Sequence, residues 1–199
     1  MKTQIHLKPG YAAMFGYGSL LLRQSMERTL GHPFAQQPIE CTLTGWRRSW
    51  DVFMPNRGFY EKTEDEEFVP ENIIYLNLRP VAGDRVNGLL YCVTEEEFSL
   101  FDEREWIYDR VRITADFEDI ELADGEAYAY VAKPQWILDG TSSRAWAALR
   151  ASYLSIVEAG LNELGMGFRE VYDRSTDPVP AHRVFADLRR ENSEPLARS

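Results

Sequence analysis

The sequence has little positive charge relative to its negative charge. Lys and Arg total 22 against 32 Asp and Glu, which gives a formal net charge of −10. Nucleic acids and anionic membrane surfaces both bind proteins through a basic face, so this balance argues against either as a main partner. A local array of backbone amides can still bind a small anion against the overall field. We therefore expect a small-molecule ligand rather than a nucleic acid or a membrane.

Long apolar runs and cysteines are also scarce. No apolar run approaches the roughly 20 residues of a membrane-spanning helix, and residues 1–9 (MKTQIHLKP) lack the apolar segment of a signal peptide. Cys41 and Cys92 lie far apart, each among apolar residues. That placement is typical of buried free thiols in a reducing compartment. These features predict a soluble cytoplasmic protein.

Histidine is equally sparse. His6, His32 and His182 are scattered, with no i, i+4 pair and no neighbouring cysteine cluster. This pattern argues against a zinc site, and we expect neither a metal nor another cofactor. No local motif supports a Ser-His-Asp triad, although the sequence leaves that arrangement open.

The apolar content is sufficient for a packed core. Hydrophobic residues make up 44% of the 199 residues, and aromatic residues 13%, which is typical of a folded chain of one domain. No repeat or linker divides the sequence. We expect a single domain over residues 1–188, followed by a polar tail over residues 189–199.

The order of predicted elements indicates the fold class. Strand patterns cover residues 12–17, 39–54, 73–78, 86–93, 108–117 and 127–132. The segment 39–54 is either a strand pair or one long strand bent at Gly45. Turns are expected at 81–84 and at Asp124-Gly125, and a loop over 55–70. Helical patterns cover 20–30, 95–102, 143–164, 168–174 and 182–188. Many strands followed by late helices predict an α+β fold with a curved or closed sheet.

The most informative segment is residues 15–20, with the sequence FGYGSL. It follows an apolar strand pattern and precedes a leucine-rich helical one. A strand, a turn of small residues and a helix start in this order can bind an anion, because the first helical amides have no intrahelical partner. Glycine also lets a ligand approach the backbone closely. A carboxylate or a phosphate could therefore bind here.

Three nucleotide or nucleophile motifs fit this segment poorly. A dinucleotide fingerprint needs a third glycine at position 21, which is Leu21. A P-loop needs a Gly-Lys-Ser/Thr ending, which is missing. Ser19 does not stand in a G-x-S-x-G sequence, so a nucleophile elbow is also disfavoured.

A second informative segment runs from residue 98 to residue 110, with the sequence FSLFDEREWIYDR. It begins in a helix that opens with a capping box at residues 94–97 (TEEE). If Phe98, Phe101 and Trp106 face the core, Glu105 is drawn inward beside aromatic rings. Burial would then raise its pKa, which suits a proton shuttle near neutral pH. The alternative is a surface Glu105 paired with an arginine.

Taken together, three segments resemble the gamma-glutamylcyclotransferase superfamily, which includes the AIG2-like and ChaC-like proteins. They are FGYGSL at 15–20, VNGLLYCV with Gly88 at 86–93, and the spacing F-D-x-x-E-x-x-Y-x-R at 101–110. Their order covers about the first two thirds of the chain. Trp106 and Ile107 follow Glu105, where members of the superfamily often have small residues.

The resemblance implies a small mixed β-barrel with flanking helices and a cavity at its mouth. It also implies that backbone amides of Tyr17, Gly18, Ser19 and Leu20 hold the substrate's α-carboxylate. By position, the single catalytic acid of the superfamily is Glu105, and Tyr108 and Tyr130 are expected to line the pocket. The implied activity is conversion of a γ-glutamyl amide or peptide to 5-oxoproline and a free amine, with no cofactor.

This chemistry agrees with what the sequence lacks. The α-amine of a γ-glutamyl compound is its own nucleophile, so proximity supplies much of the rate and no Ser, Cys or metal is required. One carboxylate can accept the ammonium proton and return it to the leaving amine. Two alternatives stay open: a catalytically silent binding domain on the same scaffold, and an acyl-transfer hydrolase that uses Ser19. The leaving group is also open among glutathione, γ-glutamyl dipeptides and γ-glutamyl-ε-lysine. Arg47, Arg48 and the acidic run 61–67 either influence that choice or are solvated surface.

Overall fold

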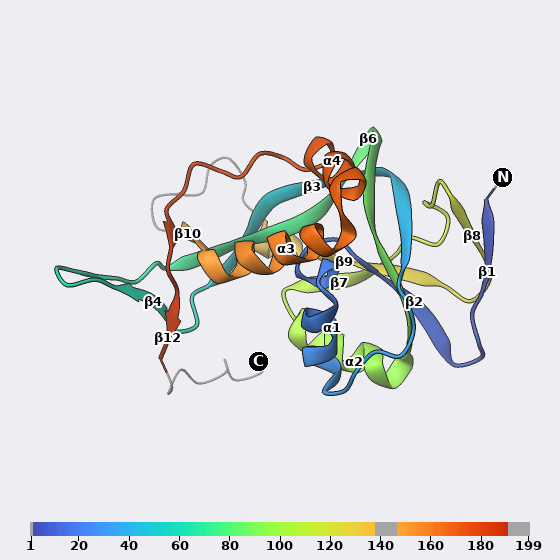
Figure 1. Ribbon diagram of the computed structural model, residues 1–199, viewed down its shortest axis with the longest axis horizontal. Coiled ribbons are helices and arrows are strands. Elements are labelled where there is room, and N and C mark those ends of the chain that lie inside the picture. The colour runs from blue at the N-terminus through green and yellow to red at the C-terminus, as the bar shows by residue number, and fades with distance from the viewer. Residues whose placement is uncertain (1, 138–146, 191–199) are drawn as a thin grey trace.

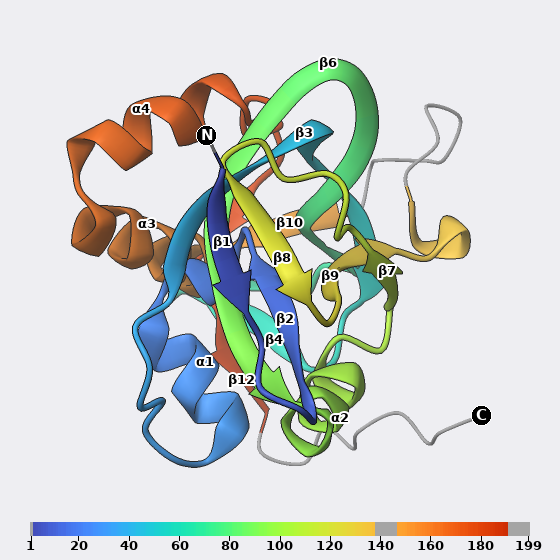
Figure 2. The same ribbon diagram turned by 90° about the vertical axis from the view of Figure 1, so that its right-hand side faces the viewer.

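Two long antiparallel strands, β3 (Ile39–Pro55) and β6 (Asn72–Thr94), form the centre of the fold. The computed structural model describes residues 2–137 and 147–190. Of the two alternatives for residues 39–54, one long bent strand is correct, and Gly45 (φ 79°) lies at a register shift. The turn predicted at 81–84 is wrong, because β6 continues through it and curves strongly (Figure 2). Pairing of Pro80 and Arg85 with β3 on either side holds this segment within the strand, and Gly83 (φ 87°) lies where it bends.

A small mixed barrel is built around this pair. The strands follow the order β6, β2 (Tyr11–Gly16), β9 (Ala127–Ala132) and β7 (Tyr108–Arg112). Strands β2 and β9 are parallel, and the other neighbours are antiparallel. The chain beyond β7 then returns to β3: the amide of Thr44 donates to the Asp116 carbonyl (2.8 Å), and the amide of Glu118 donates to the Thr42 carbonyl (2.9 Å). The predicted α+β fold with a closed sheet and flanking helices is confirmed.

Short peripheral strands surround this barrel: two of them join its sheet at β6, and the others form two small separate sheets. They are β1 (Thr3–His6) with β8 (Ile120–Asp124), β10 (Ala147–Arg150) with β6 and β11 (Val184–Phe185), and β4 (Phe59–Lys62) with β5 (Glu67–Phe68) and β12 (Leu188–Arg189). The loop predicted over 55–70 therefore contains two strands, and the helix predicted over 182–188 is wrong. The turn at Asp124-Gly125 joins β8 to β9, which pair with different strands, so it is not a hairpin. Strands β11 and β12 pair with β10 and β4, which are distant in the chain, and no local pattern reveals these partners.

The helices lie outside the barrel (Figure 1). They are the 3₁₀ turns η1 (Ser19–Leu21) and η2 (Pro134–Trp136), and the α-helices α1 (Arg23–Leu30), α2 (Glu95–Arg104), α3 (Ala151–Leu164) and α4 (Met166–Arg174). The helix predicted over 20–30 is interrupted at Leu22, which is extended. The helix predicted over 143–164 begins only at Ala151. Residues 147–150 pair with β6 as β10 instead, and residues 143–146 lie outside the described residues.

The capping box predicted at residues 94–97 is confirmed. Thr94 caps α2: its side chain accepts from the amide of Glu97, and the Glu97 carboxylate accepts from the amide of Thr94. Gly31 and Gly165 end α1 and α3 with φ of 77° and 84°, a region that favours glycine. The Thr94 cap fixes where α2 begins, and Glu105 is the C-cap at the other end of this helix.

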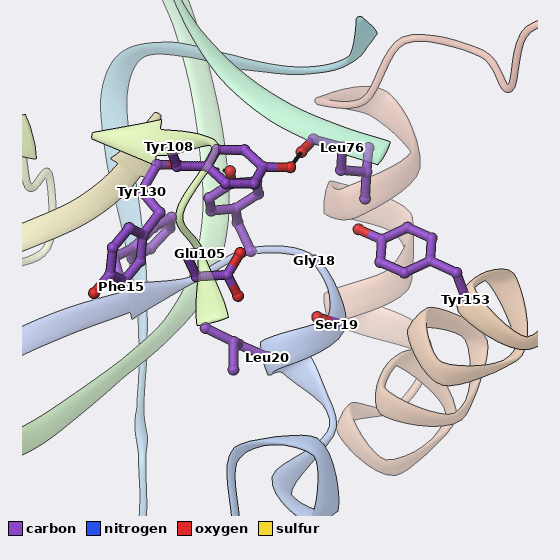
Figure 3. Close-up of a pocket in the computed structure, with 10 residues that line it drawn as sticks. Phe15, Gly18, Ser19, Leu20, Leu76, Glu105, Tyr108, Tyr130 and Tyr153 are labelled. Atoms are coloured by element: carbon purple, nitrogen blue, oxygen red, sulfur yellow. Dashed lines mark hydrogen bonds between the residues drawn. The ribbon is translucent and has the colours of Figure 1, made fainter. Parts of the chain in front are cut away.

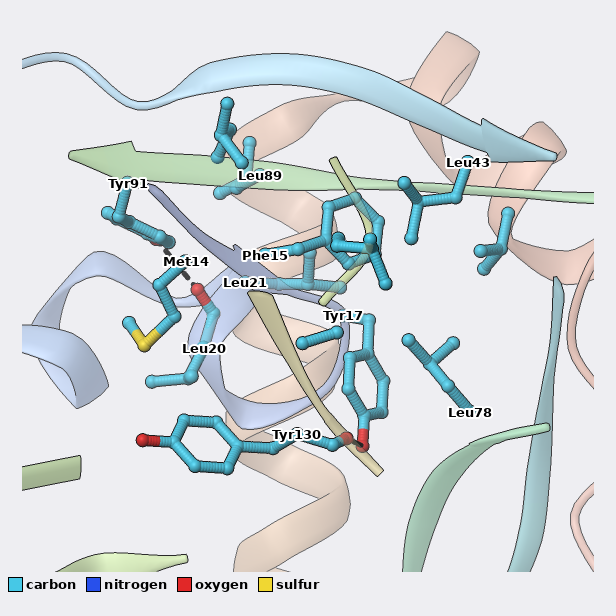
Figure 4. Packing of buried hydrophobic residues seen from close by; sticks show 14 of the residues in the cluster. Met14, Phe15, Tyr17, Leu20, Leu21, Leu43, Leu78, Leu89, Tyr91 and Tyr130 are labelled. Carbon is cyan, nitrogen blue, oxygen red and sulfur yellow. Dashed lines mark hydrogen bonds between the residues drawn. The ribbon is translucent and has the colours of Figure 1, made fainter. Parts of the chain in front are cut away.

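The core fills the barrel (Figure 4). Two residues of α2, Phe98 and Phe101, also belong to it. Of the three aromatic residues considered around Glu105, Phe98 and Phe101 are fully buried, whereas Trp106 is only half-buried. Gly88 is a point of close approach, because a Cβ there would lie 2.7 Å from the Gly16 carbonyl oxygen. Cys41 is buried, Cys92 is half-buried, and both are free thiols. None of the described helices is long and apolar enough to cross a membrane.

Candidate active site

The segment after β2 forms a tight turn into η1. The amide of Leu21 donates to the Gly18 carbonyl at 3.0 Å, so the amides of Ser19 and Leu20 are the first of the turn and have no helical carbonyl partner. The turn is fixed from behind by hydrogen bonds. The Tyr91 hydroxyl donates to the Leu20 carbonyl at 2.7 Å, and the Tyr17 hydroxyl donates to the Tyr130 carbonyl at 2.7 Å.

Arg48 lies directly behind this turn and is completely buried. Its Nε donates to the Tyr17 carbonyl at 3.1 Å, and its remaining donors contact neutral oxygens of Asn87, Tyr172, Ser175 and Thr176. No carboxylate among the described residues forms an ion pair with it. Burial lowers the pKa of Arg48 to about 10, so the side chain still carries its charge at neutral pH. Neither proposed role of Arg48, leaving-group selection or solvated surface, fits this position.

Glu105 is the C-cap of α2, and its amide donates to the Phe101 carbonyl at 2.7 Å. Its side chain is only 18% exposed, and its Oε1 lies 3.0 Å from Nε of Arg104. Burial raises the pKa of the Glu105 carboxyl, and the charge of Arg104 opposes that rise. The structure thus combines the two sequence alternatives, because Glu105 is drawn inward and is also paired with an arginine.

A cavity of about 40 Å³ lies between the turn and Glu105 (Figure 3). All seven residues singled out from the sequence line it: Tyr17, Gly18, Ser19, Leu20, Glu105, Tyr108 and Tyr130. Two segments about 85 residues apart in the chain therefore converge as expected. Their roles in binding and catalysis stay predictions. The cavity adjoins a wider cleft of about 600 Å³, which shares with it Ser19, Glu105, Tyr108 and Tyr153.

The tyrosines around the cavity are neutral phenols with fixed hydroxyls. Tyr108 donates to the Leu76 carbonyl at 2.8 Å, and Tyr130 donates to Oδ1 of Asp102 at 2.6 Å. Burial raises the pKa values of Tyr17, Tyr108, Tyr130 and Tyr153 further above their usual value near 10. Glu105 is thus the lining side chain whose pKa lies closest to neutral pH.

Sequence reasoning missed three lining residues, namely Phe15, Leu76 and Tyr153. Tyr153 belongs to the apolar stripe of α3, and its hydroxyl lies 3.1 Å from where a Cβ on Gly18 would be. A tyrosine within an otherwise aliphatic stripe was the available signal, because a buried hydroxyl needs a polar environment. Phe15 and Leu76 form apolar wall, and nothing in their local sequence distinguishes them from core.

The surroundings of Ser19 do not resemble those of an activated nucleophile. Its Oγ accepts a hydrogen bond from Nη2 of Arg104 at 2.7 Å, and no histidine lines the cavity. An activated serine requires an adjacent general base. Within residues 2–137 and 147–190, no group of three His, Cys, Asp or Glu side chains is arranged to hold a metal ion.

Comparison with solved structures shows which known proteins have a similar fold. No family model matches the chain, and no curated protein sequence does. Among solved structures, the uncharacterized human protein loc79017 is similar with a TM-score of 0.56 and 15% identity, over 88% of this chain and 94% of the other. A structure described as a gamma-glutamyl cyclotransferase is similar with a TM-score of 0.52 and 15% identity, over 87% and 93%.

A third similar structure is YkqA from Bacillus subtilis, with a TM-score of 0.56 and 17% identity. The likeness covers 82% of this chain but 53% of YkqA. The chain thus has the fold found in a gamma-glutamyl cyclotransferase. The fold implied by the sequence resemblance is confirmed by these comparisons.

Proposed function

We propose that the protein is a gamma-glutamylcyclotransferase-like enzyme that converts a γ-glutamyl amide or peptide to 5-oxoproline and a free amine. The observation that carries this proposal is the position of Glu105. It is a largely buried carboxylate with a raised pKa that faces the glycine turn across a small cavity, in a fold shared with a gamma-glutamyl cyclotransferase.

The turn is proposed to bind the α-carboxylate of the substrate. Amides at Ser19 and Leu20 are available to donate hydrogen bonds, and Gly18 allows close approach to the backbone. Arg48 supports this assignment, because a buried cation with no carboxylate partner in the described chain favours an anion nearby. The tyrosine rings of Tyr108 and Tyr130 are proposed to bound the aliphatic part of the glutamyl group.

The proposed reaction is intramolecular. The α-ammonium of the substrate gives one proton to Glu105, and the freed amine attacks the γ-carbonyl carbon. A C–N bond forms within a five-membered ring, and the C–N bond to the leaving amine breaks. Glu105 returns its proton to the leaving nitrogen. The ring nitrogen then releases its second proton, which Glu105 accepts and passes to the released amine. The products are therefore 5-oxoproline, with its carboxylate, and an ammonium ion; Glu105 is again a carboxylate and no water is consumed. Holding the two reacting groups in one cavity supplies the advantage of proximity.

The environment of Glu105 suits both halves of this proton transfer. Burial raises its pKa, which makes its carboxylate a better base than an exposed glutamate. The positive charge of Arg104 opposes this rise in pKa and favours the carboxylate, which is the base form. A single group can then act first as base and afterwards as acid.

A panel of γ-glutamyl compounds, assayed for release of 5-oxoproline, tests the proposal. Glu105→Gln keeps the shape of the side chain and removes the proton shuttle, so we expect kcat to fall at least ~10²-fold with binding largely kept. Glu96→Gln, on the exposed side of the same helix, is the matched control and should retain activity.

Two results would contradict the proposal. If Glu105→Gln retains turnover while Ser19→Ala abolishes it, the protein is an acyl-transfer hydrolase. If the wild-type protein binds γ-glutamyl compounds but releases 5-oxoproline from none of the panel, it is a silent binding domain on this scaffold.

A further inference from the structure

The cleft beyond Glu105 is rich in arginine, although the protein as a whole carries a net charge of −10. Its lining includes two acidic residues, Glu103 and Glu105. Its basic lining residues are Arg28, Arg57, Arg104, Arg150 and Arg189. Arginines at the mouth of a cleft raise the local concentration of anions in spite of the global field. The leaving half of a substrate held at Glu105 would extend into this cleft, because the cleft and the cavity share Glu105 and Tyr108.

Three of these arginines are held against aromatic rings. The guanidinium carbon of Arg57 lies 4.3 Å from the ring centre of Trp106. Those of Arg150 and Arg189 lie 3.6 Å and 5.6 Å from the ring centre of Phe59. Stacking orients a guanidinium and leaves its N–H edge available to a carboxylate. The three groups come from distant parts of the chain: the β3–β4 connection, β10 and β12.

Arg150 already has protein partners. Its Nε pairs with Oδ2 of Asp187 at 2.9 Å, and its other nitrogens donate to the hydroxyls of Ser152 and Tyr75. Arg57 and Arg189 differ in this respect, because no carboxylate in residues 2–137 or 147–190 pairs with either of them. Nε of Arg57 is buried without a hydrogen-bond partner. Burial lowers the pKa of Arg57, and the positive charge of Arg189 lowers it further.

Arg57 and Arg189 line one cleft with no carboxylate counter-ion in the described part of the chain. Their mutual repulsion opposes folding, and an anionic ligand would remove that cost. We propose that Arg57 and Arg189 form an anion subsite for the leaving half of the substrate, and that this half carries two negative charges, as an acidic amino acid does. The inference rests on the proposed function for the position of the scissile bond. Charge-assisted, paired hydrogen bonds from arginine to carboxylate are the strongest contacts available there.

The other arginines considered from the sequence do not compete for this role. Arg47 pairs with Asp84 and Asp177, and Arg48 is buried behind the turn, so neither lines the cleft. The acidic run 61–67 is also elsewhere: Glu61 and Glu66 pair with Arg183, and none of the run lines the cleft. The charge that a leaving group meets is therefore positive.

Three substrates that differ in the charge of the leaving amine test this subsite. They are γ-glutamyl-glutamate, γ-glutamyl-alanine and γ-glutamyl-ethylamide, each assayed with the full chain for 5-oxoproline release. We expect kcat/KM to fall in that order. We compare kcat/KM for γ-glutamyl-glutamate with kcat/KM for γ-glutamyl-ethylamide. In Arg57→Gln and in Arg189→Gln, the ratio of the first to the second should fall by about tenfold, mainly because KM for γ-glutamyl-glutamate rises. Arg85→Gln removes an exposed arginine that pairs with Glu118 and lies outside the cleft, and it should keep the ratio.

The outcomes separate this subsite from the proposed reaction. If all three compounds release 5-oxoproline at rates that Arg57→Gln and Arg189→Gln change equally, the reaction stands and the anion subsite is refuted. If none is turned over, the proposed reaction fails. The anion subsite is then tested by calorimetric measurement of the binding of γ-glutamyl-glutamate and γ-glutamyl-ethylamide. Tighter binding of the glutamate compound that is lost in Arg57→Gln supports the subsite, and equal binding overturns it. Unchanged circular dichroism of the variants is required in each case.

Discussion

At the scale of single residues, the Glu105 carboxyl lies largely out of water and beside one guanidinium. Its side chain is 18% exposed and contacts Nε of Arg104 at 3.0 Å. Burial dominates over this pairing, so its pKa is raised above the usual value. A raised carboxyl pKa means that ionisation of Glu105 destabilises the folded state relative to the unfolded chain. The same feature that suits proton transfer therefore weakens the fold.

This cost predicts how the stability of Glu105→Gln depends on pH. Below the unfolded pKa, near 4, Glu105 is protonated in both states and contributes no penalty. As the pH rises through the folded pKa, the folded wild-type protein must release a proton that the unfolded chain has already lost, so the wild type loses stability. Relative to the wild type, Glu105→Gln should therefore be more stable at pH 8 than it is at pH 4. Urea unfolding at both pH values measures the difference.

The exposed Glu96→Gln variant is the control for this experiment, and its stability relative to the wild type should change little between the two pH values. A relative stability of Glu105→Gln that falls as the pH rises would show that pairing with Arg104 outweighs burial. The proton-shuttle argument would then lose its electrostatic basis.

At the scale of elements, the site depends on how closely β2 and β6 approach. Gly88 in β6 lies against β2, where a Cβ would be 2.7 Å from the Gly16 carbonyl oxygen. Because Gly16 ends β2, the glycine turn begins at this contact. The absence of a side chain at position 88 therefore allows the strand to deliver the turn to the cavity.

We expect Gly88→Ala to lower the free energy of unfolding by about 3 kcal/mol, because backbone and core must move apart to accept the methyl group. Gly167→Ala is the matched substitution: a Cβ there contacts nothing within 4 Å, and alanine in α4 should stabilise by about 0.5 kcal/mol. Urea unfolding of both variants is the measurement. A loss below 1 kcal/mol for Gly88→Ala would show that β2 and β6 can separate easily.

At the scale of the whole molecule, the C-terminal segment ties distant elements together. Asp187 accepts from the amide and the hydroxyl of Ser152 at the start of α3, at 2.9 and 2.7 Å, and pairs with Arg150 of β10. On either side of Asp187, β11 pairs with β10, and β12 pairs with β4. Burial opposes ionisation of Asp187, but the Ser152 hydrogen bonds and the Arg150 charge outweigh it and lower its pKa.

This linkage predicts that Asp187→Asn destabilises the protein by about 2 kcal/mol at pH 7. A lowered carboxyl pKa stabilises the fold above the unfolded pKa, and the contribution is lost as the pH falls through the folded pKa. The difference between Asp187→Asn and the wild type should therefore shrink below about pH 4. Thermal unfolding at pH 7 and at pH 3 provides the test. Asp109→Asn, on an exposed position of β7, should differ from the wild type by less than about 0.5 kcal/mol at both. If the stability difference between Asp187→Asn and the wild type is the same at pH 7 and pH 3, the charge of Asp187 contributes nothing to the stability of the fold.

Much of the candidate site could be predicted from the sequence because its determinants are local. The strand before Gly16, the helix stop at Gly31 and the capping box at Thr94 each depend on residues a few positions apart. The resemblance then joined two such segments, and Glu105 lies where it implied, on the same cavity as the turn. Tyr153 was not predicted, because its place in the cavity depends on how α3 packs against η1.

The sequence alone determined the composition of the core, the helix stop at Gly31 and the capping box at Thr94, because hydrophobic pattern and short-range hydrogen bonding decide these features. The resemblance identified the two segments that meet at the cavity. Only the tertiary structure decided the continuity of β6, the strands at 184–185 and 188–189, and the placement of Arg57 and Arg189 on one cleft. Each of these depends on contacts between residues far apart in the chain. A backbone segment that is marginal on its own takes the conformation that its distant partner satisfies with hydrogen bonds.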